Sequence, residues 1–378
     1  MCRGLILLRL KKNGNSNYEL RVTNGSERIG MKNRIHEIFE NWLDDDGEDF
    51  AGVLSVSDAS GVIALRTAGL RDHAADLPCV ADTSFGIASG TKVFTGLAVC
   101  KLIDEGKLDL DAKLWDILPY DLGQIDKNVT IYQLLTHTSG VGDYVDEEAE
   151  GFDALMDALY AKYPPKNWTN MGYYLQMVTP LPPKFQPGER WCYSNSGYVL
   201  LGLVIEAVSG VAYQQFVQDV IIAPCGLTHT GFYHMDDLPP NTALGYMQNE
   251  EGGNWHLNTD KIPVVGGSDG GIYSNAADID RLWRAIFDGK ILSQRMTAEF
   301  LKQHVVVDEE NGVAESYGLG VYHQNDNGKQ FYFALGADSG VGFFTGYFPG
   351  TKTVVSAFSN TGFHGASLLF DDLSEVLA

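Results

Sequence analysis

The pattern of apolar and polar residues becomes regular only after residue 30. Residues 1–30 contain a short apolar stretch followed by segments rich in Asn, Gly and Lys without a period, and we expect them to lie outside the domain. From Met31 onward apolar residues recur at helical spacing, at Ile35, Phe39 and Trp42. This spacing predicts a surface helix that opens the fold.

Two β-rich runs and one strongly apolar helix follow. Residues 50–57 and 61–72 are joined by an Asp-Ala-Ser-Gly sequence, which favours a tight turn and predicts an antiparallel hairpin. A predicted strand at 83–87 leads directly into Ser89-Gly90-Thr91-Lys92. The helix that leaves from this motif is apolar almost all round as far as Gly106, so we expect it to be buried.

The middle of the chain, residues 107 to about 260, indicates short helices with long irregular connections. Thr130 is a suitable N-cap for a helix at 131–135, and an apolar helix is predicted at 198–208, ending at Gly210.

β character returns toward the C-terminus, after a predicted helix at 276–287. Strand-like runs occur at residues 317–322, 330–336, 342–348 and 353–359, before a closing helix at 366–377. A helical insertion between two β-bearing ends predicts an α+β fold, an antiparallel sheet flanked by helices. We expect residues 31–106 and 260–378 to form the sheet subdomain and residues 107–259 to form a mostly helical subdomain.

Composition restricts the partners of the protein. The 378 residues carry 27 Lys and Arg against 49 Asp and Glu, a formal charge of −22, which disfavours nucleic acid and anionic membranes. The five cysteines are scattered without a Cys-x-x-Cys pair, so we expect no disulfide framework, no metal site and no cofactor. The sequence shows no export signal and no run of 18 apolar residues. We therefore expect a soluble, cytoplasmic protein; its oligomeric state is left open.

Ser89 and Lys92 are the first candidates for chemistry. A residue in the first turn of a helix has unpaired backbone N–H groups and the positive end of the helix dipole beside it, which suits a site where negative charge develops. Lys92 lies one turn further along the same face, and a buried, neutral amine there can accept the proton of the serine hydroxyl. An isolated Ser-x-x-Lys would be more simply explained by Ser89 acting as an N-cap.

Later segments give this pair a context. They are Leu134-Leu135-Thr136-His137-Thr138-Ser139-Gly140, Pro187-Gly188-Glu189, Tyr193-Ser194-Asn195-Ser196-Gly197-Tyr198 and Leu201-Gly202. In this order, and together with the Ser-x-x-Lys, they resemble the penicillin-recognising serine hydrolases. The resemblance extends from about residue 31 to 378 and is closest to the branch with class C β-lactamases, D-aminopeptidases, DD-carboxypeptidases and related esterases. It implies a β-lactamase/transpeptidase-like fold and an acyl-enzyme formed on Ser89.

The family also has a Tyr-x-Asn element, and the sequence contains two such triplets, beginning at Tyr193 and Tyr273. The first follows Pro-Gly-Glu and precedes an apolar helix, as in the family, whereas the second follows a glycine pair. The resemblance therefore assigns the role to Tyr193 and Asn195. A phenol whose pKa is lowered by a neighbouring ammonium could relay the proton, and Asn195 could hold Lys92 or the substrate. Whether Lys92 or Tyr193 is the acylation base stays open at this point.

The third family element is where this chain differs. Members carry Lys-Thr-Gly or His-x-Gly on a strand beside the site, and the corresponding residues here are Ala334-Leu335-Gly336, without a basic side chain. An alignment with one gap places Ala337 at the basic position instead, with the same consequence. By the family pattern the oxyanion hole is formed by the backbone N–H groups of Ser89 and Ala337.

These features predict a serine hydrolase that acts on a small ester or amide, of esterase or peptidase type. The alternatives are β-lactamase or D-Ala-D-Ala carboxypeptidase activity, or a catalytically weak binding protein on the same fold. His137 is a further candidate base, but it lies in a segment to which the family gives no chemistry, and we expect a structural role.

Overall fold

An eight-stranded antiparallel sheet forms the centre of the computed structural model, which describes residues 25–45, 49–248, 254–310, 313–326, 328–364 and 366–377. The strand order is β2-β1-β14-β13-β12-β11-β10-β9, so the N-terminal hairpin pairs with the last strand of the chain. The strands are β1 Gly52–Asp58, β2 Gly61–Ala68, β9 Val305–Glu310, β10 Val313–Tyr317, β11 Tyr322–Asp326, β12 Lys329–Asp338, β13 Val341–Phe348 and β14 Thr353–Ser359.

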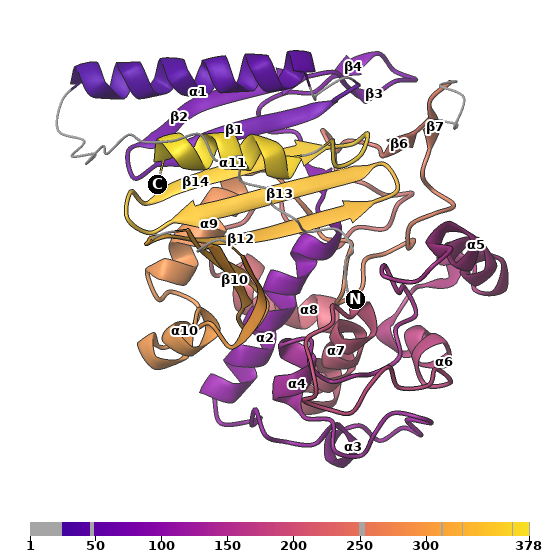
Figure 1. The fold of residues 1–378 in the computed structure, drawn as a ribbon. Coiled ribbons are helices and arrows are strands. Elements are labelled where there is room, and N and C mark those ends of the chain that lie inside the picture. Colours follow the sequence, from indigo (N-terminus) through magenta and orange to yellow (C-terminus); the bar gives the residue numbers. More distant parts are fainter. Residues whose placement is uncertain are drawn as a thin grey trace.

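Both faces of this sheet are covered by helices. On one face α1 (Gly25–Asp45) and α11 (Ala366–Leu377) lie side by side above the strands (Figure 1), and their apolar residues form one core with every second residue of the sheet. On the other face pack α2 (Thr91–Asp104), α9 (Ala276–Phe287) and α10 (Gln294–Phe300). Residues 343 and 344 show the alternation, because Phe343 belongs to the second core and Phe344 to the first.

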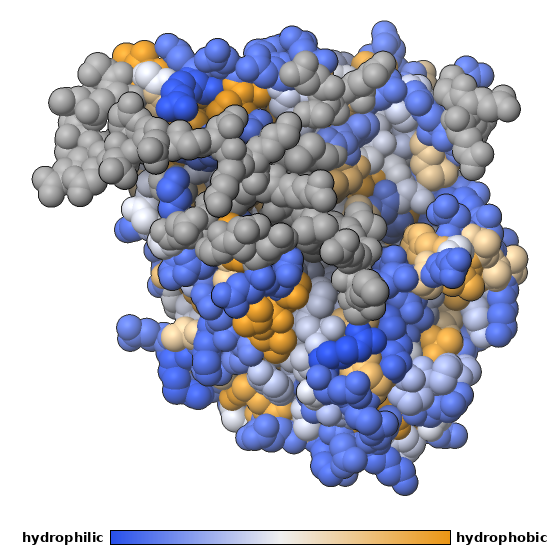
Figure 2. Space-filling model, in the orientation of Figure 1, coloured by the Kyte–Doolittle hydropathy of each residue, from blue (hydrophilic) through white to orange (hydrophobic). Residues whose placement is uncertain are grey.

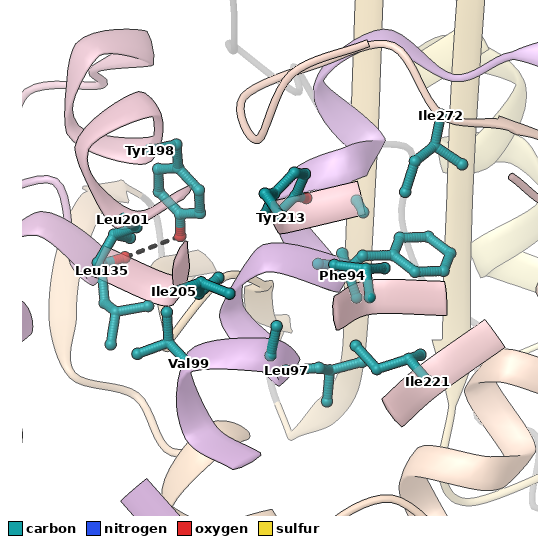
Figure 3. Close-up of a cluster of buried hydrophobic side chains, with 14 of the residues drawn as sticks. Phe94, Leu97, Val99, Leu135, Tyr198, Leu201, Ile205, Tyr213, Ile221 and Ile272 are labelled. Carbon is teal, nitrogen blue, oxygen red and sulfur yellow. Dashed lines mark hydrogen bonds between the residues drawn. The ribbon is translucent and has the colours of Figure 1, made fainter. Parts of the chain in front are cut away.

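The remaining helices gather on the far side of α2 from the sheet, as Figure 1 shows. They are α3 Leu114–Ile117, α4 Ile131–Leu135, α5 Phe152–Lys162, α6 Leu175–Val178, α7 Asn195–Ser209 and α8 Tyr213–Val217. In the close-up of Figure 3, Phe94 and Leu97 of α2 lie in one buried cluster with Tyr198 and Ile205 of α7. Because α2 is buried on both sides, it links the sheet to the helical region.

Several local predictions are confirmed. Thr130 caps α4 and forms a capping box with Gln133, and α7 ends at Gly210 with a φ of 76°. The hairpin β1–β2 and the helices α9 and α11 have the predicted places. The division into two subdomains stays a prediction.

Other boundaries differ from the prediction. The first helix begins at Gly25, so part of the segment that we expected to lie outside the domain is helical. The strand predicted at 83–87 is reduced to β5 (Phe85–Gly86), which pairs only with the short β8 (Tyr273–Ser274).

The prediction of a strand at residues 317–322 is wrong. Residues 318–321 form the turn between β10 and β11, whose end residues Tyr317 and Tyr322 pair with each other, and Gly320 has a φ of 123°. A Cβ on Gly96 of α2 would lie 2.0 Å from the carbonyl oxygen of Leu319, so the turn packs tightly against α2. The neighbouring strand β9 ends in three acidic residues, Asp308, Glu309 and Glu310, which are uncommon in strands and obscured its β character in the sequence.

The face of the molecule in Figure 2 is mainly hydrophilic, with separate apolar patches. Among the described residues no single helix is long and apolar enough to cross a membrane. One pair, α7 with Tyr213–Ile222, reaches the required length and composition only when taken together across a bend of 77°.

Candidate active site

Ser89 lies in a single 3-10 turn, Ala88–Gly90, between β5 and α2. The preceding Ala88 has a φ of 41°, an unusual conformation for a residue with a side chain. Gly90 contacts the ring of Phe343 so closely that a Cβ at this position would lie 2.5 Å from it. The surrounding residues are buried, whereas Ser89 itself keeps part of its surface exposed. The turn therefore presents one hydroxyl on a tightly packed support.

Strand β12 lies directly against this turn. A Cβ on Gly336 would lie 2.2 Å from the carbonyl oxygen of Ile87 and 2.8 Å from the backbone nitrogen of Ser89. Only a residue without a side chain permits this approach. Gly336 is thus a contact residue between the strand and the Ser89 turn.

The amine of Lys92 has three neighbours at hydrogen-bonding distance. Its Nζ lies 3.0 Å from Ser89 Oγ, 2.8 Å from Asn195 Oδ1 and 2.7 Å from the carbonyl oxygen of Asp269. The side chain is buried, with 2% of its surface exposed. Burial lowers the pKa of Lys92 below 10.5, while the charges of Asp269, Glu147, Asp143 and Asp338 act in the opposite direction.

These contacts determine where the lone pair of a neutral Lys92 points. The carbonyl oxygens of Asn195 and Asp269 can only accept, so two N–H groups of the amine are directed at them. The remaining position faces Ser89, whose hydroxyl can donate. The geometry therefore favours Lys92, rather than Tyr193, as the acceptor of the serine proton.

Asn195 is held by the segment that precedes α5. Its Nδ2 donates to the carbonyl oxygen of Val145 and to Glu147 Oε1, both at 3.1 Å, which orients Oδ1 toward Lys92. The carboxylate of Asp143 accepts from the backbone N–H groups of Asn195 and Ser196, at 2.8 and 2.9 Å. Asp143 thereby binds the free N–H groups at the start of α7.

Tyr193 lies close to both Ser89 and Lys92. Its hydroxyl is hydrogen-bonded to Ser89, and Lys92 Nζ lies 4.8 Å from the centre of its ring. Burial raises the pKa of Tyr193 well above 10, so the lowered phenol pKa that we expected is wrong. Burial thus lowers the pKa of the Lys92 amine and raises that of the phenol, and Tyr193 is a neutral phenol that can donate and accept a proton.

His137 packs against this tyrosine. Its ring lies 4.6 Å from the ring of Tyr193, centre to centre, and its Nδ1 accepts from the N–H of Ser194 at 3.1 Å. Burial lowers the pKa of His137 well below 6.5. The imidazole is therefore neutral and packs as a structural element, as expected.

The second Tyr-x-Asn triplet has a different function in the fold. Tyr273 pairs with Gly86 across β5 and β8, and Asn275 caps α9 by accepting from the N–H of Asp278. The structure therefore places Asn195, and not Asn275, beside Lys92.

The end of β12 offers a backbone donor toward the site. Strand β11 pairs with β12 only as far as Phe333, whereas β13 pairs along β12 to Asp338. Asp338 and Val341 flank the two-residue turn, and hydrogen-bonded and non-hydrogen-bonded pairs alternate from there. The N–H of Ala337 therefore points away from β13, toward the edge that β11 leaves unpaired.

The comparison with known proteins agrees with this geometry. A sequence profile of the Beta-lactamase family matches residues 39–376. The chain belongs to this family, the penicillin-recognising serine hydrolases. The assignment of Ala334, or with one gap Ala337, to the basic position of the family's third element stays a prediction, and the Ala334–Gly336 segment itself contains no basic residue.

The alignments with individual similar proteins cover most of the chain. The putative penicillin-binding protein PbpX of Bacillus subtilis is 28% identical over 337 residues, which are 89% of this chain and 73% of that protein. The structure of a penicillin binding protein from Bacillus halodurans is 35% identical, with a TM-score of 0.80 over 90% of this chain and 98% of the other. A D-stereospecific amidohydrolase from Streptomyces sp. shares the fold at 23% identity, with a TM-score of 0.75 over 90% of this chain and 97% of the other. Further curated relatives are longer, and this chain spans only 60% and 42% of two of them.

The predicted β-lactamase/transpeptidase-like fold is thus confirmed. The site of this β-lactamase-family protein also contains acidic residues that the sequence analysis missed, namely Asp143, Glu147 and Asp338, together with the Asp269 backbone. Asp143 and Glu147 follow the Thr-His-Thr-Ser-Gly segment within ten residues, which is the signal that could have identified them. Among the described residues no group of His, Cys, Asp or Glu could hold a metal ion.

Proposed function

We propose that the protein is a serine hydrolase that forms an acyl-enzyme on Ser89 and acts on a small ester or amide. The main support is the hydrogen bond between Lys92 Nζ and Ser89 Oγ, with the other two positions of the amine occupied by carbonyl oxygens. This arrangement makes Lys92 the general base and Ser89 the nucleophile.

In the acylation step Ser89 Oγ attacks the substrate carbonyl carbon and its proton moves to Lys92. The carbonyl π electrons move to the oxygen, which the N–H groups of Ser89 and Ala337 stabilise. When the tetrahedral intermediate collapses, the bond to the leaving group breaks. Tyr193, which is hydrogen-bonded to Ser89, passes the proton from Lys92 to the leaving group.

Deacylation reverses the roles with water as the nucleophile. The water gives its proton to Lys92, directly or through Tyr193, and its oxygen attacks the ester carbon. The Ser89 oxygen then leaves and takes back a proton, and the free acid is released. No cofactor takes part in these steps.

The missing basic side chain in the third element favours an esterase or peptidase over a β-lactamase or D-Ala-D-Ala carboxypeptidase. Both alternative activities involve substrates with a free carboxylate, and Ala334 supplies no cation for it. The same missing cation supports the second candidate, a catalytically weak binding protein on this fold.

Intact-mass analysis tests the proposal. The protein and its Ser89→Ala variant are exposed to a fluorophosphonate and to panels of activated esters, amides and β-lactams. We expect one phosphonyl adduct on the wild type, none on the variant, and transient acyl adducts with at least one ester or amide. Equal labelling of the variant would remove Ser89 from the mechanism. A stable fluorophosphonate adduct without turnover of any panel compound would support the binding protein.

A further inference from the structure

Two successive carbonyl oxygens of one loop accept hydrogen bonds from α2. The carbonyl oxygen of Ser268 accepts from Thr95 Oγ1 at 2.6 Å, and that of Asp269 accepts from Lys92 Nζ at 2.7 Å. Thr95 comes three residues after Lys92, so the two side chains project from the same face of the helix, one turn apart. The carbonyl that contacts the base therefore follows directly after the one that Thr95 binds.

The hydrogen of the Thr95 hydroxyl has a defined direction. A threonine hydroxyl has one hydrogen to donate, and the Ser268 carbonyl oxygen can only accept it. The hydroxyl of Tyr213 lies 2.7 Å from Thr95 Oγ1 and must therefore be the donor in that contact. Tyr213 belongs to the buried cluster of Figure 3, and burial raises its pKa, so the phenol keeps its proton. Both side chains are 0% exposed, and hydrogen bonds run in one direction from Tyr213 through Thr95 to the loop.

The loop contains two glycines directly after Asp269. Gly270 and Gly271 separate Asp269 from Ile272, whose N–H donates to Thr91 Oγ1 at 3.0 Å, and Gly271 has a φ of 104°. Glycines leave the backbone wide conformational freedom. The orientation of the Asp269 carbonyl therefore depends on the contacts at Asp269 itself and at the residue before it.

Besides the bond to Lys92, three contacts act on these two residues. Ser268 Oγ donates to the carbonyl oxygen of Tyr198 at 2.8 Å, and the hydroxyl of Tyr144 donates to the Asp269 carboxylate. These two contacts fix side chains. The third, from Thr95, acts on the backbone, because the Ser268 carbonyl belongs to the peptide group that joins Ser268 to Asp269.

We propose that Thr95 is a positioning residue for the general base, because its hold on the Ser268–Asp269 peptide group keeps the Asp269 carbonyl on one N–H of Lys92. The lone pair of the amine then stays directed at Ser89. The proposal rests on the function proposed above and adds a residue that acts through the loop rather than on the reacting atoms. A misplacement of the base by about 1 Å can cost on the order of a hundredfold in rate, so such a contact affects catalysis.

Thr95→Val tests this role, because it removes the hydroxyl and keeps the shape of the side chain. With a neutral p-nitrophenyl ester we expect kcat to fall roughly tenfold with little change in KM, since the base is displaced while the contacts of the substrate remain. Thr95→Ser keeps the hydroxyl and should restore most of kcat. A Thr95→Val variant with the wild-type kcat, or a Thr95→Ser variant as slow as Thr95→Val, would overturn the proposal.

Thr345→Val is the matched control. Thr345 of β13 is also buried, and its hydroxyl also donates to a carbonyl, that of Val355, and accepts from an aromatic side chain, that of Trp283. This variant should lower the thermal unfolding temperature but keep the wild-type kcat. An equal loss of kcat in the control would attribute the effect to general destabilisation and contradict a positioning role. If Thr95→Val does not fold, Thr95→Ala removes the same hydroxyl with a smaller side chain, and the same outcomes apply to it.

The pH profile separates a displaced base from a weakened fold. Burial lowers the pKa of Lys92, and the charge of Asp269 is the largest of those that raise it, ahead of Glu147, Asp143 and Asp338. A carbonyl that accepts from the amine also favours its charged form. When Asp269 moves away in Thr95→Val, the pKa of Lys92 should fall further, and the rise of kcat/KM should move to lower pH. A rise that stays in place or moves to higher pH would refute the positioning role.

A measurement without substrate separates this proposal from the proposed function. The carbon NMR signal of Lys92 Cε, identified by its absence in Lys92→Arg, reports the titration of the amine directly. If Thr95→Val moves this titration to lower pH and the wild type hydrolyses no ester, the positioning of Lys92 is supported and the proposed function is contradicted. If the wild type hydrolyses esters and Thr95→Val leaves the titration in place, the function is supported and the positioning role is overturned.

Discussion

Lys92 Nζ lies 3.0 Å from Ser89 Oγ, one helical turn away from it, and is held from its other sides by Asn195 and Asp269. The first contact follows from the spacing of the two residues on a helix. The other two depend on segments distant in sequence, since the Asp269 carbonyl is 177 residues from Lys92. The chemistry of a local motif is thus determined by its tertiary partners.

The proton relay leads to a double-mutant prediction. Lys92→Ala and Tyr193→Phe should each lower kcat by on the order of a hundredfold or more, because the base and the hydrogen-bonded phenol act on the same proton. The double variant should be little worse than the worse single variant. Steady-state kinetics with a neutral p-nitrophenyl ester measures this, and independent, multiplicative losses would contradict a shared relay.

The neutral amine predicts a pH dependence. Because burial lowers the pKa of Lys92 below 10.5, its amine loses its proton at a lower pH than the amine of an exposed lysine does. We expect kcat/KM for a neutral ester to rise with pH and to level off below pH 10.5, while Tyr193 stays protonated because its pKa is raised.

Two carboxyl groups near the site also titrate within the pH range of such an experiment and require a control. Desolvation by the surrounding protein raises the pKa of Asp143 and of Asp338 to about 7, although the side chain of Asp338 is still open to solvent. Asp338→Asn removes one of them and should leave the rising profile in place. A profile that is flat, or that falls as pH rises, would exclude a neutral Lys92 as the base.

The contact between Gly336 and the Ser89 turn predicts a large effect from one methyl group. In Gly336→Ala the new Cβ would overlap the carbonyl oxygen of Ile87 and crowd the nitrogen of Ser89, so β12 must move away. The backbone N–H groups of Ser89 and Ala337, which form the proposed oxyanion hole, then move apart. We therefore expect kcat to fall by about a hundredfold or more.

Gly350→Ala is the matched control for this variant, because no atom lies within 4 Å of a Cβ there. It should retain wild-type kcat. If Gly336→Ala folds and has normal activity, β12 does not contribute to the oxyanion hole.

The parts of the fold that the sequence predicted correctly depend on short-range signals. The Thr130–Gln133 capping box, the glycine that ends α7 and the strand-like runs of β12 to β14 are each local to one element. The turn at 317–322 was misjudged because its apolar residues pack against α2, a contact that no local pattern encodes.

In the site, too, the residues that could be predicted from the sequence were those in local motifs. Ser89, Lys92, Tyr193 and Asn195 belong to motifs with fixed spacing, and the structure brings them together. The direction of the Tyr193 pKa shift was not predictable, because it depends on burial among side chains from several elements. Glu147 was also missed, since its contact with Asn195 crosses 48 residues.

The absent cation at the third element gives the last prediction. Ala334 is 5% exposed and supplies no charge to the site, and the charges that act on Lys92 are those of the acidic residues Asp269, Glu147, Asp143 and Asp338. One peptide substrate, compared as the free acid and as its amide or methyl ester, should therefore give a higher kcat/KM in the uncharged form. Ala334→His should reduce this difference by raising kcat/KM for the free acid, whereas Ala334→Leu, which adds bulk without charge, should not.

Because Ala334 is buried, the thermal unfolding temperature of both variants must first show that they fold. A wild type that already prefers the free acid would show that the third element is assigned to the wrong residues. Arg281 or Lys302 would then have to leave its carboxylate partner, Asp278 or Glu299, to bind the substrate.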